Sequence, residues 1–266
     1  MAQQIIIGDN NWQEFVGDGE SVVIDGHRRY FGFKPTAGRM RVAPFMTLEK
    51  AGVPLIPESD WASRAQKMLD DKADLKSLCY HLEPLDQNGR GQCHLYGNCS
   101  AMRGLSVRQG GVLRCPSAQS LAYAVWGGRS WGNSGADPAS SFEALLEQGA
   151  ARSEIWPMDG DGQSSRFATP EAEADRANLK LLVGVELGID NDMWKETVSC
   201  LLQGIPVSVA FGWWNHHVCG YSYLPNGNLV ILNSWGDWSD NGFGELSGSK
   251  KYPDQAFAFI RMAQSV

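Results

Sequence analysis

Hydrophobic positions recur at helical spacing through much of the first two thirds of the chain. Ala65, Leu69 and Ala73 repeat at the interval of one helix face, inside a stretch rich in Lys and Asp, which predicts an amphipathic helix. Pro116-Ser117 and Asp137-Pro138 are residue pairs that suit the start of a helix. The helices expected on these grounds are residues 61–81, 93–105, a helix opening at 116–117, a helix running from 137–138 to about 149, and residues 190–203.

Alternating or continuous apolar runs of strand length lie at the two ends of the sequence. Residues 4–7 and 21–24 are short β-like runs, and residues 206–211 alternate in the manner of a strand. Two further runs, 218–223 and 228–233, flank an Asn226-Gly227 turn, which is a strong hairpin signal.

The helix expected at 93–105 begins with a cysteine. A thiol at a helix N-terminus lies beside unpaired N–H groups and the positive end of the helix dipole, which favour the nucleophilic thiolate. Cys99 is a competing candidate, but Leu95, Cys99 and Met102 fall on one apolar face, which predicts a buried and inert thiol. Gln87 and Gly91 precede Cys93 in a loop that suits the return of an amide donor to the sulfur. Cys93 is therefore the expected nucleophile.

Several short motifs occur in one order along residues 55–266. Beyond the loop from Gln87 to Cys93, they are Ile56 to Trp61, Ser117 to Leu121, Asn215 to Val218, Asn233 to Gly236, and Asn241 to Phe243. In type and order they resemble the papain-like cysteine peptidases. The resemblance implies a papain-like two-subdomain α+β fold, with a helical half, an antiparallel β-barrel-like half and a cleft between them. It assigns residues 55–266 to the peptidase domain and residues 1–54 to a β-rich N-terminal extension.

The resemblance also implies a role for each site residue. Cys93 is the nucleophile, His216 the base that later protonates the leaving group, and Asn233 the amide that orients the imidazole. The side chain of Gln87, with the backbone N–H of Cys93, forms the oxyanion hole. The expected hairpin would bring His216 and Asn233 onto neighbouring strands.

Alternatives remain open at some of these positions. Gln92 competes with Gln87 as the amide donor, and His217 competes with His216, although adjacent strand residues face opposite ways and only one can meet the thiol. Trp235 is either an aromatic cover over the Asn233 contact or a core tryptophan. His94 stands where relatives place Trp, and this departure indicates either a tuned thiol or lost hydrolysis.

Residues 127–138 are too rich in Gly and small side chains for a regular element. The matching stretch of the family is an extended edge that pairs with the substrate backbone, which makes Gly135 and Ala136 candidates for substrate contact. A plain surface loop is the alternative.

Composition excludes some functions. The net charge of −7 argues against nucleic-acid binding, which rests on Lys and Arg at phosphates. No apolar run is long enough for a membrane span, and the first residues lack the features of a signal peptide. The six cysteines show no framework spacing, and Arg90, Ala124 and Asn133 stand where secreted relatives place disulfide partners. We therefore expect a reducing intracellular compartment. No Cys/His cluster has zinc spacing, and the expected chemistry needs no metal or cofactor.

The extension, residues 1–54, lacks the long charged helical pattern of the family's inhibitory propeptides. Its strand character favours an appendage packed on the domain or on a protein partner over a cleaved pro-segment.

The function expected from these observations is thiol-dependent hydrolysis of a peptide or amide bond through a Cys-His-Asn site, with a peptide or protein as substrate. Acyl transfer uses the same residues and stays open. An alternative from another class is a papain-fold protein kept for binding or assembly, such as a virion component. His94, the short approach to His216 and the extra N-terminus motivate this alternative.

Overall fold

The structure is a computed structural model, and it describes residues 4–35, 46–110, 114–127, 135–158, 165–189 and 191–263. Its helices are α1 Trp61–Asp70, α2 Leu75–Cys79, α3 Cys93–Arg108, α4 Ala118–Trp126, α5 Pro138–Glu147, α6 Pro170–Asn178 and α7 Met193–Leu201. Its strands are β1 Ile6–Ile7, β2 Ser21–Ile24, β3 His27–Tyr30, β4 Leu181–Glu186, β5 Val207–Phe211, β6 His216–Tyr223, β7 Leu229–Leu232, β8 Phe243–Leu246 and β9 Gln255–Met262.

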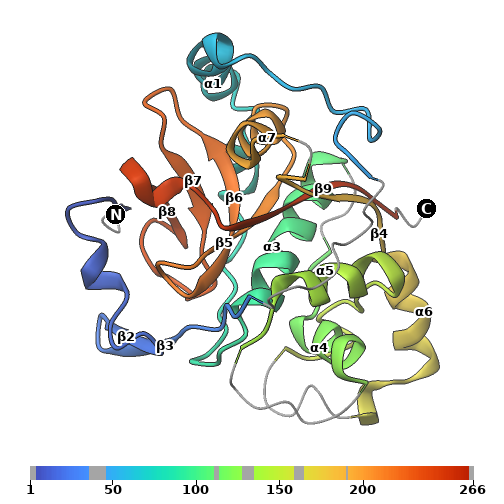
Figure 1. Ribbon diagram of the computed structural model, residues 1–266. Helices are drawn as coiled ribbons and strands as arrows, with labels where there is room; N and C mark the ends of the chain where they lie inside the picture. The colour runs from blue at the N-terminus through green and yellow to red at the C-terminus, as the bar shows by residue number, and fades with distance from the viewer. Residues whose placement is uncertain are drawn as a thin grey trace.

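Helices and strands separate into two halves. Helices α4, α5 and α6 gather on one side of α3, and β5 to β8 lie on its other side (Figure 1). The main sheet has seven strands in the order β1-β8-β7-β6-β5-β9-β4, and it is antiparallel except where β1 joins β8. This confirms the expected α+β class with a helical half and an antiparallel sheet half.

Local capping explains where helices begin. The Ser117 side chain accepts a hydrogen bond from the backbone N–H of Ser120 (3.1 Å), and Asp137 accepts from Ala139 (3.0 Å). Each side chain satisfies a backbone donor of the first helical turn, which has no partner within the helix. The predicted starts of α4 and α5 are confirmed.

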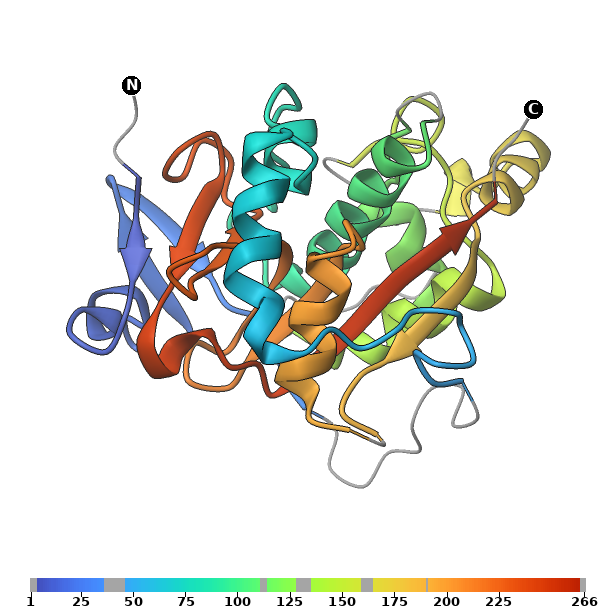
Figure 2. The same cartoon turned by 90° about the horizontal axis from the view of Figure 1, so that it is seen from above.

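The single helix expected over residues 61–81 is wrong. The chain leaves the helical conformation at Lys72, whose φ is 51°, and a second helix, α2, starts after Asp74. The Asp74 carboxylate accepts from the backbone N–H of Ser77 at 3.1 Å, and this cap favours a new start over a continuous helix. Helix α1 lies beside α7 (Figure 2), where Trp61 and Ala65 pack against Val198.

The predicted hairpin is present, with β6 and β7 paired antiparallel around the Asn226-Gly227 turn. The sequence did not indicate β4, which pairs with β9 at the far edge of the sheet. It also did not indicate that the N-terminal strand β1 would add to the main sheet, in parallel with β8.

Helix α3 is the centre of the molecule, with residues 93–106 all buried. It packs against β6 on one side and against α4 and α5 on the other. The Tyr221 hydroxyl on β6 donates to the backbone carbonyl of Ser100 at 2.7 Å. Gly97 makes room for the ring of His217, since a Cβ at this position would lie 2.4 Å from the ring's Nδ1. None of the helices in the described ranges has both the length and the apolar character needed to cross a membrane.

We expect Gly97→Ala to lower the free energy of unfolding by about 1 to 3 kcal/mol, because the added methyl overpacks the contact between α3 and β6. The sign is informative, since replacing glycine by alanine inside a helix otherwise stabilises by about 1 kcal/mol. Urea denaturation measures the change. The double variant Gly97→Ala/His217→Ala should recover most of the loss, and no recovery would contradict the predicted clash.

Candidate active site

Cys93 is the first residue of α3, as the sequence predicted. Its side chain is fully buried and packs against Phe33 of the N-terminal extension and Ala210 of β5. Cys99, the competing thiol, lies six residues further along α3, in the main hydrophobic core. Of these two thiols, Cys93 is the one at the N-terminus of the helix.

His216 and Asn233 meet as expected. His216 opens β6, Asn233 follows β7, and the imidazole Nε2 lies 2.8 Å from the Asn233 Oδ1. Because an amide oxygen only accepts, the imidazole carries its proton on Nε2. The other ring nitrogen, Nδ1, is buried and has no hydrogen-bond partner in this structure. Asn233 therefore fixes the orientation of Nε2, and Nδ1 keeps a lone pair that can accept a proton.

The two glutamines have different environments. Gln87 Nε2 donates to the backbone carbonyls of Tyr30 (3.0 Å) and Arg90, and its Oε1 accepts from the Ser234 hydroxyl at 2.7 Å. Gln92 instead accepts from Gln119 on α4 at 2.8 Å, within the helical half. Of the two amides, Gln87 is the one that presents a donor to a carbonyl oxygen beside α3.

Aromatic rings surround the imidazole of His216. Trp235 lies 4.7 Å away between ring centroids, Trp214 4.9 Å and Phe31 5.9 Å. Trp235 is fully buried. The sequence pointed to Trp235 but not to Trp214 or Phe31. The adjacent Trp213-Trp214 pair, directly before the histidine motif, was the available signal for Trp214.

The other two histidines near Cys93 face the helical half. The His217 Nδ1 lies 3.3 Å from the backbone carbonyl oxygen of Cys93. The hydrogen bond of this ring is therefore to the helix backbone and not to the thiol. His94 packs edge-on against Trp126 of α4, with 5.6 Å between ring centroids. It fills the space between helices and is fully buried.

A segment of the chain's own N-terminal extension covers the site. The backbone N–H groups of Gly32 and Phe33 donate to the carbonyl of Asn215 at 3.2 and 3.0 Å. On the opposite side, Ala136 N–H donates to Gly32 (2.9 Å) and the Ala136 carbonyl accepts from Lys34 (3.2 Å). We call residues 31–34 the cover. Figure 1 shows the chain leaving β3 and running toward α3 and α5.

The predicted edge at Gly135 and Ala136 is thus engaged by the protein itself. Phe33 and Ala136 form a parallel bridge. Gly135 has a φ of 76°, and a Cβ there would lie 2.4 Å from the Gly32 carbonyl oxygen, so the approach requires glycine. Residues 128–134 of the expected irregular segment lie outside the described residues.

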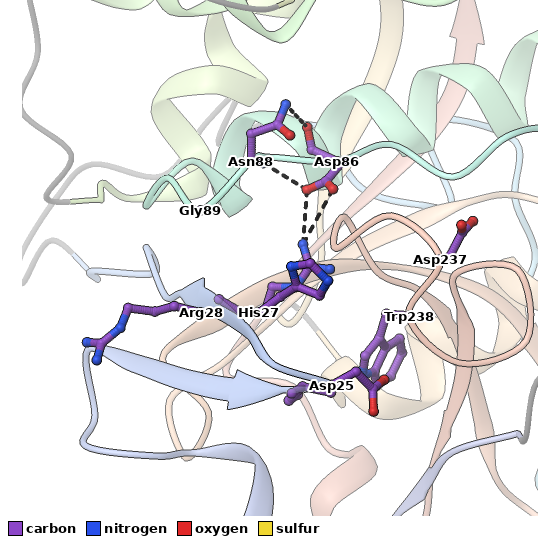
Figure 3. A pocket seen from close by; sticks show the side chains of 10 residues that line it. Asp25, His27, Arg28, Asp86, Asn88, Gly89, Asp237 and Trp238 are labelled. Atoms are coloured by element: carbon purple, nitrogen blue, oxygen red, sulfur yellow. Dashed lines mark hydrogen bonds and ion pairs between the residues drawn. The ribbon is translucent and has the colours of Figure 1, made fainter.

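The hairpin that precedes the cover contacts the loop that carries Gln87. Arg29 of β3 pairs with the Asp86 carboxylate at 3.2 Å. A hollow of about 630 Å³ lies alongside, between hairpin residues His27 and Arg28 and loop residues Asp86 and Asn88 (Figure 3). Beside this hollow, the hairpin contacts the loop through the Arg29–Asp86 ion pair and through the hydrogen bond from Gln87 Nε2 to the Tyr30 carbonyl.

Burial sets the protonation of the site. It raises the pKa of the Cys93 thiol to about 12, against a smaller opposing effect of nearby backbone N–H groups, including those of His217 and Gly32. It lowers the pKa of His216 to about 3, although the hydrogen bond to Asn233 favours the charged ring. With the cover in place, both groups are neutral at pH 7. In the described residues, no hydrogen bond joins the thiol to the His216 ring.

The three buried imidazoles make stability fall at acid pH. Burial lowers the pKa of His94, His216 and His217 to about 3, whereas each would titrate near 6.5 when unfolded. Below pH 6.5 the unfolded chain therefore binds protons that the folded chain does not. Each imidazole should lower the free energy of unfolding by up to about 1.4 kcal/mol for each pH unit between pH 6.5 and 3.

Urea unfolding at a series of pH values measures this loss. His94→Phe, which keeps a ring against Trp126, should show a shallower slope than the parent chain below pH 6.5. Equal slopes in the two chains would contradict the buried neutral state of His94.

All six cysteines lie in the described part of the chain and are free thiols. Among the residues that the structure describes, no group of His, Cys, Asp and Glu side chains is arranged to hold a metal ion.

Comparison with solved structures finds proteins of similar fold. No family model and no curated protein matches the sequence. Xylellain, a cysteine protease from Xylella fastidiosa, is similar with a TM-score of 0.58 and 15% identity, over 73% of this chain and 85% of its own. Procathepsin L 3 of the Tenebrio molitor larval midgut is similar with a TM-score of 0.57 and 18% identity, over 69% of this chain and 67% of its own. A stem bromelain precursor is similar with a TM-score of 0.54 and 16% identity, over 80% of this chain and 75% of its own. The chain has the fold of the papain-like cysteine proteases.

Proposed function

We propose that this chain is a thiol-dependent peptide or amide hydrolase that acts through Cys93, His216 and Asn233 and that its own cover holds closed. The observation that carries the proposal is the oriented imidazole of His216. Its Nε2 is fixed by Asn233 at 2.8 Å, while its buried Nδ1 has no partner. A ring with this orientation supports a role for His216 as the base that activates a thiol at a helix N-terminus.

The proposed reaction transfers the acyl group of the substrate first to the sulfur of Cys93 and then to water. When a substrate replaces the cover, Nδ1 of His216 takes the thiol proton and the sulfur of Cys93 bonds to the carbonyl carbon. The carbonyl π electrons move onto oxygen, where Gln87 Nε2 and the Cys93 N–H stabilise the charge. The C–N bond then breaks and the amine leaves with the proton of the imidazolium. Water, deprotonated by the imidazole, then attacks the thioester, the C–S bond breaks, and the imidazolium returns its proton to the sulfur. The carboxylic acid product loses its proton to solvent.

Contacts of Tyr30, the last residue of β3, and of the cover that follows it support the role of these groups. The Gln87 Nε2 donates to a backbone carbonyl of the extension, that of Tyr30, which is the kind of acceptor that a substrate offers. Ala136 pairs through both its N–H and its carbonyl with the cover backbone. Two of the similar structures are of a procathepsin and a precursor. These contacts favour a peptide or protein substrate that takes the place of residues 31–34.

Loosening the cover tests the proposal. Phe33 packs on Cys93, and removing a buried Phe side chain costs about 3 to 5 kcal/mol, so Phe33→Ala should shift the equilibrium toward the open site. We expect labelling of Cys93 by an epoxide thiol trap to rise at least about a hundredfold in Phe33→Ala, since each 1.4 kcal/mol is tenfold. Mass spectrometry of the labelled peptides measures the rate at each cysteine.

The chain supplies its own control. Cys99 is buried in the main core and reports global unfolding, so its labelling should stay slow in both proteins. Adding His216→Ala to Phe33→Ala should slow labelling of Cys93, and adding Cys93→Ser should abolish labelling at this position. If several cysteines react slowly and alike in all variants, hydrolysis is excluded and the binding or assembly role is favoured instead.

A further inference from the structure

The connection that delivers His216 to the site is a tight turn. Phe211, the last residue of β5, pairs directly with His216, so residues 212–215 alone make the reversal. Two of these residues are Trp213 and Trp214, and Asn215 has a φ of 48°. Four residues are too few to surround the rings of Trp213 and Trp214, so other segments of the protein have to pack against them.

Trp214 fixes one side of the imidazole. Its ring meets that of His216 edge-on at 4.9 Å and 65°, and it meets the ring of Trp235 at 5.6 Å and 84°. Trp214 is 1% exposed. The Asn233 hydrogen bond fixes the plane of the imidazole at one atom, and packing against Trp214 limits its sideways movement.

Trp214 in turn is held by the N-terminal extension. Its Nε1 donates to the backbone carbonyl of Phe15 at 3.0 Å, and the Asn215 side chain donates to the carbonyl of Gly19 at 3.2 Å. Trp12 packs edge-on against Trp213 at 6.2 Å. We call residues 12–19 the buttress, because they hydrogen-bond to this turn and pack against it.

The buttress is anchored in the fold. Strand β1, just before it, is hydrogen-bonded to β8, and the Lys250 ammonium lies 4.0 Å from the ring centre of Trp12. Phe15 belongs to the same buried cluster as Trp214. In the cover, Phe31 belongs to this cluster too, whereas residues 32–34 pair with Asn215 and Ala136 through backbone hydrogen bonds. The extension therefore has two parts that act differently on one site.

We infer that Trp214 is a positioning residue for His216 and that the buttress is a permanent part of the active site, so that opening must lift residues 31–34 while residues 12–19 stay in place. The inference rests on the proposed function. It assigns opposite effects to neighbouring parts of one extension. Loss of the cover exposes the thiol, and loss of the buttress releases the imidazole that activates it.

The test uses the full chain carrying Phe33→Ala, compared with and without Trp214→Phe. The phenylalanine keeps a ring near His216 but removes the Nε1 donor to Phe15. Trp61→Phe is the matched control, since Trp61 is 7% exposed and its Nε1 donates to the Ile56 carbonyl at 3.0 Å, in contact with α7. The readout is the alkylation rate of Cys93 by iodoacetamide as a function of pH.

We expect Trp214→Phe to slow alkylation about tenfold near pH 6, where the thiolate depends on the imidazolium, and to converge with its parent near pH 10, where the thiol ionises unaided. Trp61→Phe should follow the parent throughout. If the parent reacts at pH 6 in a His216-dependent way and Trp214→Phe matches it, or is slowed equally at every pH, the positioning role is overturned. If the parent itself shows no His216 dependence, the proposed hydrolase fails first.

Discussion

Burial of an imidazole between an amide and aromatic rings is the constraint on which the site depends. Taking a neutral ring out of water costs free energy unless its nitrogens find hydrogen-bond partners, and here Asn233 supplies one partner at 2.8 Å. Trp214 and Trp235 exclude water from two sides. The sheet has to hold β6 and β7 in one register for this to happen, since a shift of one residue would turn His216 away from Asn233.

Helix α3 has to pack closely on β6 for the same site to form. Its N-terminus has to approach β6 closely, and Gly97 allows this because a side chain there would collide with His217. The same crowding brings three neutral imidazoles into the interior near one thiol. The molecule thus combines tight packing with groups that become charged readily in water, and only exclusion of water keeps them neutral.

The sequence predicted the parts of the fold that depend on local signals. The caps at Ser117 and Asp137, the start of α3 at Cys93 and the Asn226-Gly227 hairpin are encoded within a few residues and appear where expected. Lys72 was missed because its left-handed conformation has no glycine to mark it. Strands β4 and β1 were missed as sheet members, because their partners β9 and β8 lie far away in sequence. The cover was missed for the same reason, since backbone hydrogen bonds leave no pattern in side chains.

The short parallel strand β1 has a consequence beyond the site. Without it, β8 would form one edge of the sheet and present a row of unpaired N–H and C=O groups. Ile5 and Ile7 satisfy part of that row, since their carbonyls accept hydrogen bonds from Glu245 and Ser247 at 3.0 and 2.8 Å. A chain that lost its first residues would offer this open edge to a second copy, so the N-terminus also guards against strand-to-strand aggregation.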